Sequence, residues 1–216
     1  VIVGPEEPLV LGITDKLRNK NIKTFGPTKN ASRLEGSKSF MKELVVNNNI
    51  PTASYGSFSD IEEAKKYIYK NGAPIVIKTS GLAAGKGVLI CQTIDDAIDA
   101  VNKVMKEKMF GAAGNEIIIE EFLTGEEVSF FALIDGKNIM PLASAQDHKA
   151  VGDGDKGPNT GGMGAYSPAP AMTSSLQNKV MKEIITPTVE AMNKSGNQYQ
   201  GVLFAGLMIT DSGPKL

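Results

Sequence analysis

The order of apolar and polar positions predicts helices and strands that alternate along most of the chain. Apolar residues recur every three or four positions in five segments, which is the spacing of a helix with one buried face. These segments are residues 9–17, 31–46, 59–72, 93–105 and a stretch from about Ser174. Short runs rich in Val and Ile predict strands at residues 1–3, 22–25, 74–78, 88–91, 117–120, 128–134, 139–145 and 202–209. The pattern therefore predicts a mixed α/β and α+β fold.

Local signals mark where several of these elements begin or bend. Ser59 with Glu62, and Thr93 with Asp96, place an acid three positions after a hydroxyl residue, which is the pattern of a helix start. Pro187 lies inside the last predicted helix and should kink it, because proline lacks the N–H that the helix needs. These signals give the predicted helices definite boundaries.

The predicted elements group into three parts. Residues 1–53 contain the end of a βαβ unit and a connecting helix, and residues 54–124 form a small α+β module with a glycine-rich hairpin. Residues 125–216 form a second module, with a hairpin at Asp135-Gly136 and a polar loop from Asp147 to Gly164. Because the chain opens inside a strand and closes in mid-hairpin, we expect an internal fragment of a longer protein.

Composition and charge exclude several classes of protein. The chain has 216 residues, 41% of them apolar, which is enough to bury a core as one large domain or two small ones. Lys and Arg number 23 against 24 Asp and Glu, so the net charge of -1 gives no general attraction to nucleic acids or anionic membranes. No apolar run approaches a membrane span, and a single cysteine, Cys91, cannot form an internal disulfide. We therefore expect a cytoplasmic protein with no nucleic acid and no membrane partner.

A glycine-rich segment predicts contact with phosphate groups. It consists of Gly81, Leu82, Ala83, Ala84, Gly85, Lys86 and Gly87. A P-loop needs four residues between its glycines and a Ser or Thr after its lysine, whereas this segment has three residues and a glycine. The short β-branched run that follows predicts instead a loop joining two strands of a hairpin. Such a loop can lay backbone N–H groups over phosphates, with Lys86 at its tip and Lys78 at its base.

Two other interpretations of this segment are weaker. A protein kinase also has a glycine hairpin, but its phosphate-binding lysine follows the loop, whereas Lys78 precedes it, and neither His-Arg-Asp nor Asp-Phe-Gly occurs in the sequence. A surface turn with solvated lysines is the simpler alternative when this stretch is taken alone.

The order of Lys78, the glycine-rich segment and residues 117–129 resembles that of the ATP-grasp superfamily. The resemblance implies an ATP-grasp fold, in which two α+β modules clamp ATP, preceded here by the end of a βαβ domain. It implies that Glu120 and the backbone around Phe122 contact adenine, that Glu127 contacts the ribose, and that Lys38 is a second nucleotide lysine. The nucleotide-binding residues implied are Lys38, Lys78, Gly81, Ala83, Ala84, Gly85, Lys86, Gly87, Glu120, Glu121, Phe122, Leu123 and Glu127, of which Lys78 and Lys38 are also implied to be catalytic.

Further motifs resemble one family of that superfamily, the phosphoribosylamine–glycine ligases. They are Gln146-Asp147-His148-Lys149 and residues 157–168, Gly-Pro-Asn-Thr-Gly-Gly-Met-Gly-Ala-Tyr-Ser-Pro, and residues 3–9 are similar to the family's substrate-phosphate turn. The substrate-binding residues implied are Gly4, Pro5, Glu6, Pro8, Asp147, His148, Lys149, Asn159, Thr160, Gly161, Gly162, Met163 and Gly164. For the lone histidine, a structural hydrogen bond is the alternative to substrate contact.

This resemblance implies a C–N ligase of purine (IMP) biosynthesis. The glycine carboxylate attacks the γ-phosphate of ATP to give glycyl phosphate, and the amine of 5-phosphoribosylamine then displaces phosphate, which gives glycinamide ribonucleotide. The implied cofactors are ATP and Mg²⁺ or Mn²⁺. The family's metal ligands, a Glu and an Asn, would lie beyond Leu216, so we expect none in this chain and leave the fragment's own activity open. The alternatives are another ATP-grasp carboxylate–amine ligase and a non-catalytic nucleotide-binding module.

Overall fold

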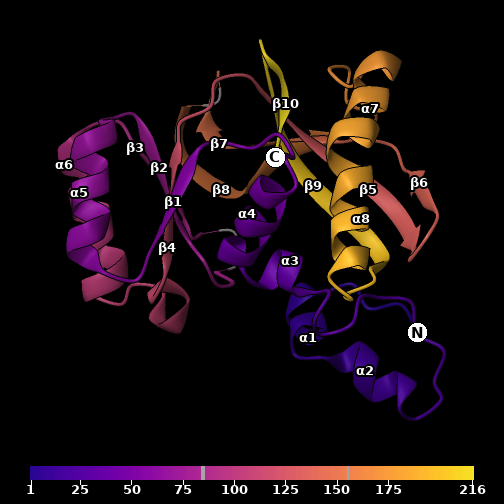
Figure 1. Ribbon diagram of the computed structural model, residues 1–216. Helices are drawn as coiled ribbons and strands as arrows, with labels where there is room; N and C mark the ends of the chain where they lie inside the picture. Colours follow the sequence, from indigo (N-terminus) through magenta and orange to yellow (C-terminus); the bar gives the residue numbers. More distant parts are fainter. Residues whose placement is uncertain (84–85, 155) are drawn as a thin grey trace. The chain divides into compact units, whose positions relative to one another are not determined.

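The computed structural model describes residues 1–83, 86–154 and 156–216 (Figure 1). The expected phosphate contacts at Ala84 and Gly85 therefore lie outside the described residues, as does the side chain of Asn159. The chain divides into two compact units, residues 1–122 and 123–216. Each unit contains its own antiparallel sheet. The division into three parts that the sequence predicted stays a prediction.

The first 36 residues form three short helices, α1 (Glu6–Val10), α2 (Ile13–Arg18) and α3 (Arg33–Gly36). The prediction of strands at 1–3 and 22–25 was wrong, because the structure has a single parallel bridge between Ile2 and Phe25. A parallel pair is normally buried on both faces by helices, and the side chain of Ile2 is 78% exposed. Residues 1–3 and 22–25 therefore pair only through this bridge and do not form two strands.

The helix predicted at 31–46 is divided in two at Ser37. The backbone of Ser37 is extended, with φ -144° and ψ 106°, and its hydroxyl accepts a hydrogen bond from the Phe40 N–H. Ser37 is therefore the N-cap of a new helix, α4 (Lys38–Asn47), because a serine oxygen can satisfy an N–H that the first helical turn leaves unpaired. This break places Lys38 in the first turn of α4.

The first unit is built on a four-stranded antiparallel sheet. Its strands are β1 (Tyr55–Phe58), β4 (Ile117–Glu121), β2 (Ile75–Thr79) and β3 (Val88–Cys91), in that order across the sheet. Ile75, Ile77, Ile117 and Ile119 are buried in one cluster with residues of α5 (Ile61–Asn71) and α6 (Ile94–Val101), which a π turn extends through Asn102–Lys106. A 3-10 turn, Gly111–Gly114, precedes β4. The pairing of β2 with β3 confirms the predicted hairpin.

One of the two predicted helix starts is displaced by a residue. The N-cap of α5 is Asp60, whose carboxylate accepts a hydrogen bond from the Glu63 N–H, and not Ser59 as the sequence pattern predicted. Serine and aspartate are both favoured N-cap residues, so the sequence alone does not show which of the two caps the helix. Asp60 is the cap because α5 begins at Ile61. The Thr93–Asp96 capping box at the start of α6 is confirmed, with both reciprocal hydrogen bonds present.

The second unit has a sheet with the order β10 (Gly213–Lys215), β9 (Gln200–Thr210), β5 (Glu126–Asp135) and β6 (Ile139–Pro141). Figure 1 shows α7 (Ser174–Val180) and α8 (Thr186–Lys194) lying against this sheet, with a π turn at Met181–Ile185 between them. Pro187 is the second residue of α8 and follows the π turn within continuous helical backbone, where proline removes one hydrogen bond of the helix. The helix therefore changes its winding just before the proline.

The strand predicted at 139–145 is shorter than expected. Pro141 ends β6, because proline cannot donate to the ladder, and pairing resumes only at an isolated bridge between Ala145 and Ser129. The returning strand expected near the end of the chain is present as β10, paired with β9.

The polar loop predicted from Asp147 to Gly164 was wrong as a description of the backbone. The segment contains two paired antiparallel strands, β7 (Gln146–Gly152) and β8 (Lys156–Tyr166), with irregular register between His148 and Gly152. Glycines hid this ribbon from sequence reasoning, because strand prediction depends on β-branched side chains. Gly157 and Gly162 have φ of 90° and 121°, which other residues rarely adopt.

Within the described part of the chain, no helix has the length and apolar character needed to cross a membrane.

Candidate functional site

Lys78 and Glu120 lie on the face of the first sheet opposite α5 and α6. Val76 of β2 is paired with Glu120 of β4, and Lys78 with Ile118, so the lysine and the carboxylate are diagonal neighbours on one face. Lys78 Nζ donates a hydrogen bond of 2.8 Å to Glu120 Oε2. The alternation of β2 therefore places its lysine beside the acid that the sequence analysis assigned to the same site.

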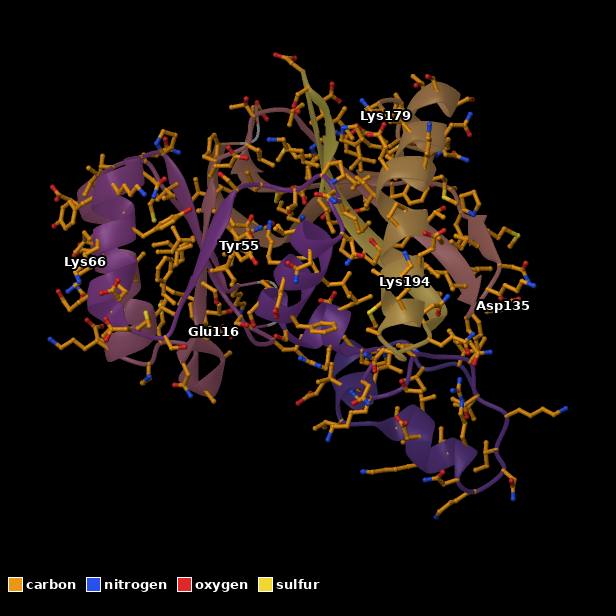
Figure 2. All side chains as sticks on the ribbon, viewed as in Figure 1. Tyr55, Lys66, Glu116, Asp135, Lys179 and Lys194 are labelled. Atoms are coloured by element: carbon orange, nitrogen blue, oxygen red, sulfur yellow. The ribbon has the colours of Figure 1, made fainter. Side chains whose placement is uncertain are left out.

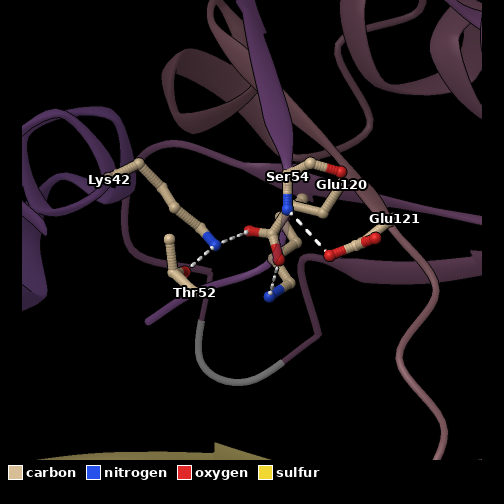
Figure 3. Close-up of polar contacts among 6 residues, drawn as sticks. Lys42, Thr52, Ser54, Glu120 and Glu121 are labelled. Atoms are coloured by element: carbon tan, nitrogen blue, oxygen red, sulfur yellow. Dashed lines mark hydrogen bonds and ion pairs between the residues drawn. The ribbon is translucent and has the colours of Figure 1, made fainter. Parts of the chain in front are cut away.

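A second lysine, Lys42 of α4, contacts the other oxygen of Glu120 (Figure 3). Its Nζ lies 3.3 Å from Glu120 Oε1 and donates a hydrogen bond of 2.6 Å to Thr52 Oγ1. The Lys42 side chain is 1% exposed and that of Glu120 is 5% exposed. Sequence reasoning missed Lys42, although its position four residues after Lys38 puts the two lysines on the same face of one helix.

Burial works against the charge of these lysines. It lowers the pKa of Lys42, an effect that Glu120 only partly offsets, and Lys78 adds to the lowering by repulsion. Burial likewise lowers the pKa of Lys38, with Glu35 opposing the shift and Lys78 adding to it. A protein stabilises charged groups in such a setting by supplying opposite charge. An anion bound beside these lysines would supply it.

The first unit thus brings Lys38, Lys42 and Lys78 around one buried carboxylate, that of Glu120. Two further acids lie beside the cluster: Glu35 opposes the lowered pKa of Lys38 more strongly than Glu120 does, and Glu121 accepts a hydrogen bond of 3.0 Å from the Ser54 N–H. Burial raises the pKa of Glu35, while the charge of Lys38 opposes this shift. We call these four residues, the three lysines and Glu120, the lysine cluster, in which lysines outnumber the carboxylate by three to one.

The glycine-rich loop starts and ends against tightly packed neighbours. A Cβ added at Gly81 would lie 3.0 Å from the Ala113 backbone, and one added at Gly87 would lie 2.2 Å from Thr79 Oγ1. The Thr79 N–H donates to the Gly87 carbonyl across the base of the loop, and the Lys86 N–H donates to the Ala83 carbonyl. Because the loop joins two antiparallel strands, it is not a P-loop, which would open a helix. Lys86 is exposed.

In the second unit, Lys149 of β7 is held by two acids. It donates to Glu127 of β5 in a close ion pair, and its Nζ lies 3.7 Å from Asp147 Oδ2. Burial alone would lower the pKa of Lys149, but the hydrogen bond and charge of Glu127, with Asp147, raise it. Glu127, expected at the ribose, therefore lies beside two residues expected at the substrate.

The β7–β8 ribbon gathers the other residues expected to bind substrate. His148 packs its ring 5.7 Å from that of Tyr166, whose hydroxyl donates to Gln146 Oε1. Thr160 Oγ1 donates to the Lys149 carbonyl and accepts from the Gly162 N–H. The backbone of the remaining expected residues lies on β8: Asn159, Gly161, Met163 and Gly164.

The remaining expected residues lie at the ends of other elements. Pro5 is the N-cap of α1, Glu6 and Pro8 are in this five-residue helix, and Gly4 has open space around it. Glu6 is near enough to Glu35 for its charge to contribute to the raised pKa of that carboxyl. Phe122 and Leu123 follow β4 at the boundary between the two units.

The fold defines a class of protein. The biotin carboxylase domain of the 2-oxoglutarate carboxylase from Hydrogenobacter thermophilus, solved with MgADP, ADP and bicarbonate, matches it with a TM-score of 0.74 at 19% identity. The match covers 99% of this chain and 46% of that chain. A glycine hairpin module followed by a second α+β unit is therefore the ATP-grasp fold, as the motifs implied.

Within that class, the chain belongs to the phosphoribosylglycinamide synthetase family. The family's N domain matches residues 1–35, and its ATP-grasp (A) domain matches residues 36–216. The phosphoribosylamine–glycine ligase of Mesorhizobium japonicum is 60% identical over 216 residues. The crystal structure of the Thermotoga maritima phosphoribosylamine–glycine ligase has a TM-score of 0.87 at 34% identity, over 100% of this chain and 52% of that one.

The chain spans about half the length of the curated relatives it matches, with 51% of the Mesorhizobium japonicum protein covered. Membership of an ATP-grasp ligase family implies the use of ATP and a divalent metal. Among the described residues, no group of three or more His, Cys, Asp or Glu side chains is arranged to hold a metal ion. The expectation that the metal ligands lie beyond Leu216 stays a prediction.

Proposed function

We propose that this chain is part of a phosphoribosylamine–glycine ligase and carries its nucleotide site. The observation that supports the proposal most directly is the lysine cluster, in which Lys42 and Lys78 contact one buried carboxylate and Lys38 interacts with its charge. An excess of partly buried positive charge favours binding of a polyanion, and the phosphates of ATP are such a polyanion. Family membership points to the same ligand.

In the proposed reaction, the glycine carboxylate attacks the γ-phosphate of ATP and forms glycyl phosphate and ADP. The amine of 5-phosphoribosylamine then attacks the activated carbonyl, and phosphate leaves as the amide forms. Lys38, Lys78 and the backbone amides of the glycine-rich loop bind the phosphates and offset their charge. Positioning supplies most of the rate enhancement, so no protein nucleophile is required.

The ribbon of the second unit is proposed to bind the substrates. Lys149 remains charged beside Glu127 and Asp147, and Thr160 and nearby glycine amides offer donors to a phosphate or a carboxylate. Glu127 and the segment 120–123 are proposed to contact the nucleoside.

The proposal also includes three further points. The chain divides into parts at 1–53, 54–124 and 125–216, the enzyme uses Mg²⁺ or Mn²⁺, and it is located in the cytoplasm.

The nucleotide site is tested by calorimetric titration of the chain with magnesium and a non-hydrolysable ATP analogue. Lys78→Met should weaken binding at least about tenfold, because it removes a charge at the base of the loop. Lys66→Met is the matched control, since Lys66 is an exposed lysine of α5, paired with Glu63 and labelled in Figure 2. It changes the net charge equally and should leave affinity unchanged. Absence of saturable binding by a folded chain would overturn the nucleotide site.

The reaction itself is tested on the full-length protein. ADP release should require both glycine and phosphoribosylamine. Release of ADP with bicarbonate and a carboxyl acceptor instead would favour another ATP-grasp ligase, whose likeness to this chain is one of fold alone at 19% identity.

A further inference from the structure

A second polar cluster in the first unit adjoins the lysine cluster at Lys38 and contains one acid, Glu116, with four serines. Figure 2 labels Glu116, which directly precedes β4. Its Oε1 accepts a hydrogen bond of 2.7 Å from Ser57 Oγ, and its Oε2 accepts one of 2.8 Å from Ser39 Oγ. Ser39 Oγ also lies 2.9 Å from Ser80 Oγ and 3.0 Å from Ser37 Oγ. Neither the family motifs nor the proposed reaction assigns a role to Glu116.

The carboxylate fixes the direction of every hydrogen bond in this cluster. An ionised carboxylate only accepts, so Ser39 must donate its single proton to Glu116. Ser39 can then only accept from the neighbouring hydroxyls of Ser80 and Ser37. The Ser37 oxygen is left to accept from the Phe40 N–H, which caps α4. Burial alone would raise the pKa of Glu116, but the hydrogen bonds from Ser57 and Ser39 contribute to lowering it, so the ionised form is favoured.

This cluster joins four segments around the base of the glycine-rich loop. Ser57 is on β1, Ser37 and Ser39 flank Lys38 at the start of α4, and Ser80 lies where β2 ends and the loop begins. Backbone bonds run alongside: the Lys38 N–H donates to the Ser80 carbonyl at 2.9 Å, and the Ser80 N–H donates to the Glu116 carbonyl at 3.0 Å. Glu116 and its four serines therefore hold both Lys38 and Ser80, the residue at the start of the loop, and we call this set of hydrogen bonds the anchor.

We propose that Glu116 is a positioning residue that fixes Lys38 and the start of the glycine-rich loop relative to each other, so that both meet the same phosphate groups. The proposal rests on the nucleotide site proposed above. A lysine and a set of loop amides bind one polyanion tightly only when their spacing is set before binding, because ordering them afterwards costs affinity. Glu116 sets that spacing without touching the ligand.

The anchor is tested without nucleotide by amide hydrogen exchange of the wild type, Glu116→Gln and Glu116→Ala. Glutamine keeps the volume of the side chain, but its amide N–H₂ is a donor. A serine that donates to Glu116 in the wild type must therefore accept instead, which reverses the direction of that hydrogen bond. Exchange at Lys38 and Ser80 should accelerate about tenfold in Glu116→Gln and more in Glu116→Ala. Exchange at Ile77 and Ile119 in the sheet should not change. Equal protection of Lys38 and Ser80 in all three proteins would overturn the proposal.

The consequence for the ligand is tested by titration with magnesium and the ATP analogue. Affinity should fall about tenfold in Glu116→Gln and further in Glu116→Ala. Val101→Ala controls for stability, because it opens a cavity in the core of the same unit and should leave affinity unchanged. Equal affinity of wild type and Glu116→Gln would overturn the positioning role. A wild type that does not bind would instead refute the nucleotide site, while hydrogen exchange would still decide the anchor.

Discussion

Glu120 is a buried carboxylate that two lysines share, one at each oxygen. Lys78 contributes a hydrogen bond from the sheet, and Lys42 contributes an ion pair from α4. Buried charges cost free energy to desolvate, and an ion pair recovers this cost only when every partner is in place. Glu120 can therefore orient Lys78 only while Lys42 balances the remaining negative charge.

Replacement of Lys42 by methionine should lower the free energy of unfolding by about 3 kcal/mol at neutral pH. Methionine keeps most of the buried stem but leaves the Thr52 hydroxyl and one oxygen of Glu120 without the ammonium. The loss is at the lower end for a broken buried pair, because Lys78 still contacts Glu120. Urea denaturation measures this loss, and Thr52→Val, which removes the hydrogen bond with Lys42, should cost about 1 kcal/mol.

A double-mutant cycle checks the cause of that loss. In the Lys42→Met/Glu120→Gln protein no ionised carboxylate is left buried beside methionine, so the two losses should be clearly less than additive. Additive losses would mean that Lys42 stabilises the fold by packing alone.

At the level of elements, hydrogen bonds at helix starts determine where chain segments turn. Asp60 caps α5, Thr93 caps α6 and Ser37 caps α4, each by accepting from an N–H in the first turn. The cap at Ser37 matters most for the site, because it ends the preceding α3 segment and begins α4 at Lys38. A continuous helix from residue 31 to 46 would present Lys38 and Lys42 from a different direction.

Asp60→Ala should destabilise the first unit by about 1 kcal/mol, whereas Ser59→Ala should change its stability by only a few tenths. The two residues are adjacent and exposed, and of the two only Asp60 caps the helix, where its charge adds to the effect of the hydrogen bond. Circular dichroism during urea denaturation measures both. A larger loss for Ser59→Ala would place the helix start where the sequence pattern predicted it.

The sequence predicted the structure best where apolar side chains recur at the spacing of a helix or strand. It predicted the structure least well where glycines, which have no side chain, form the strands. The β2–β3 hairpin, the Thr93–Asp96 box and β9 were predicted because Val, Ile and capping residues mark them. The β7–β8 ribbon was missed because its glycines provide no strand pattern. Lys42 was missed because nothing local shows that its helix face will cover the acid of a strand almost eighty residues later.

At the scale of the whole molecule, the chain divides into two compact units, and each unit contains fully buried apolar side chains. The core of the first unit contains residues between Ala64 and Ile119, while Phe130, Met192 and Leu207 are fully buried in the second. A unit with its own core can unfold cooperatively by itself.

Calorimetry should therefore resolve two unfolding transitions. Ile68→Ala should lower the midpoint of one, and Met192→Ala the midpoint of the other, because each opens a cavity at a fully buried position in a different unit and costs about 2–5 kcal/mol. A single transition that both substitutions shift equally would show that the units unfold together.

Because the pKa of Lys38 and the pKa of Lys42 are both lowered, binding of a polyanion at the proposed nucleotide site should be coupled to proton uptake. Burial lowers the pKa of both side chains, so as the pH rises they begin to lose their protons before an exposed lysine does. A bound polyanion favours the charged form and draws those protons back from solution. In alkaline solution, the heat measured on binding would then depend on the ionisation enthalpy of the buffer, and this dependence would disappear towards neutral pH.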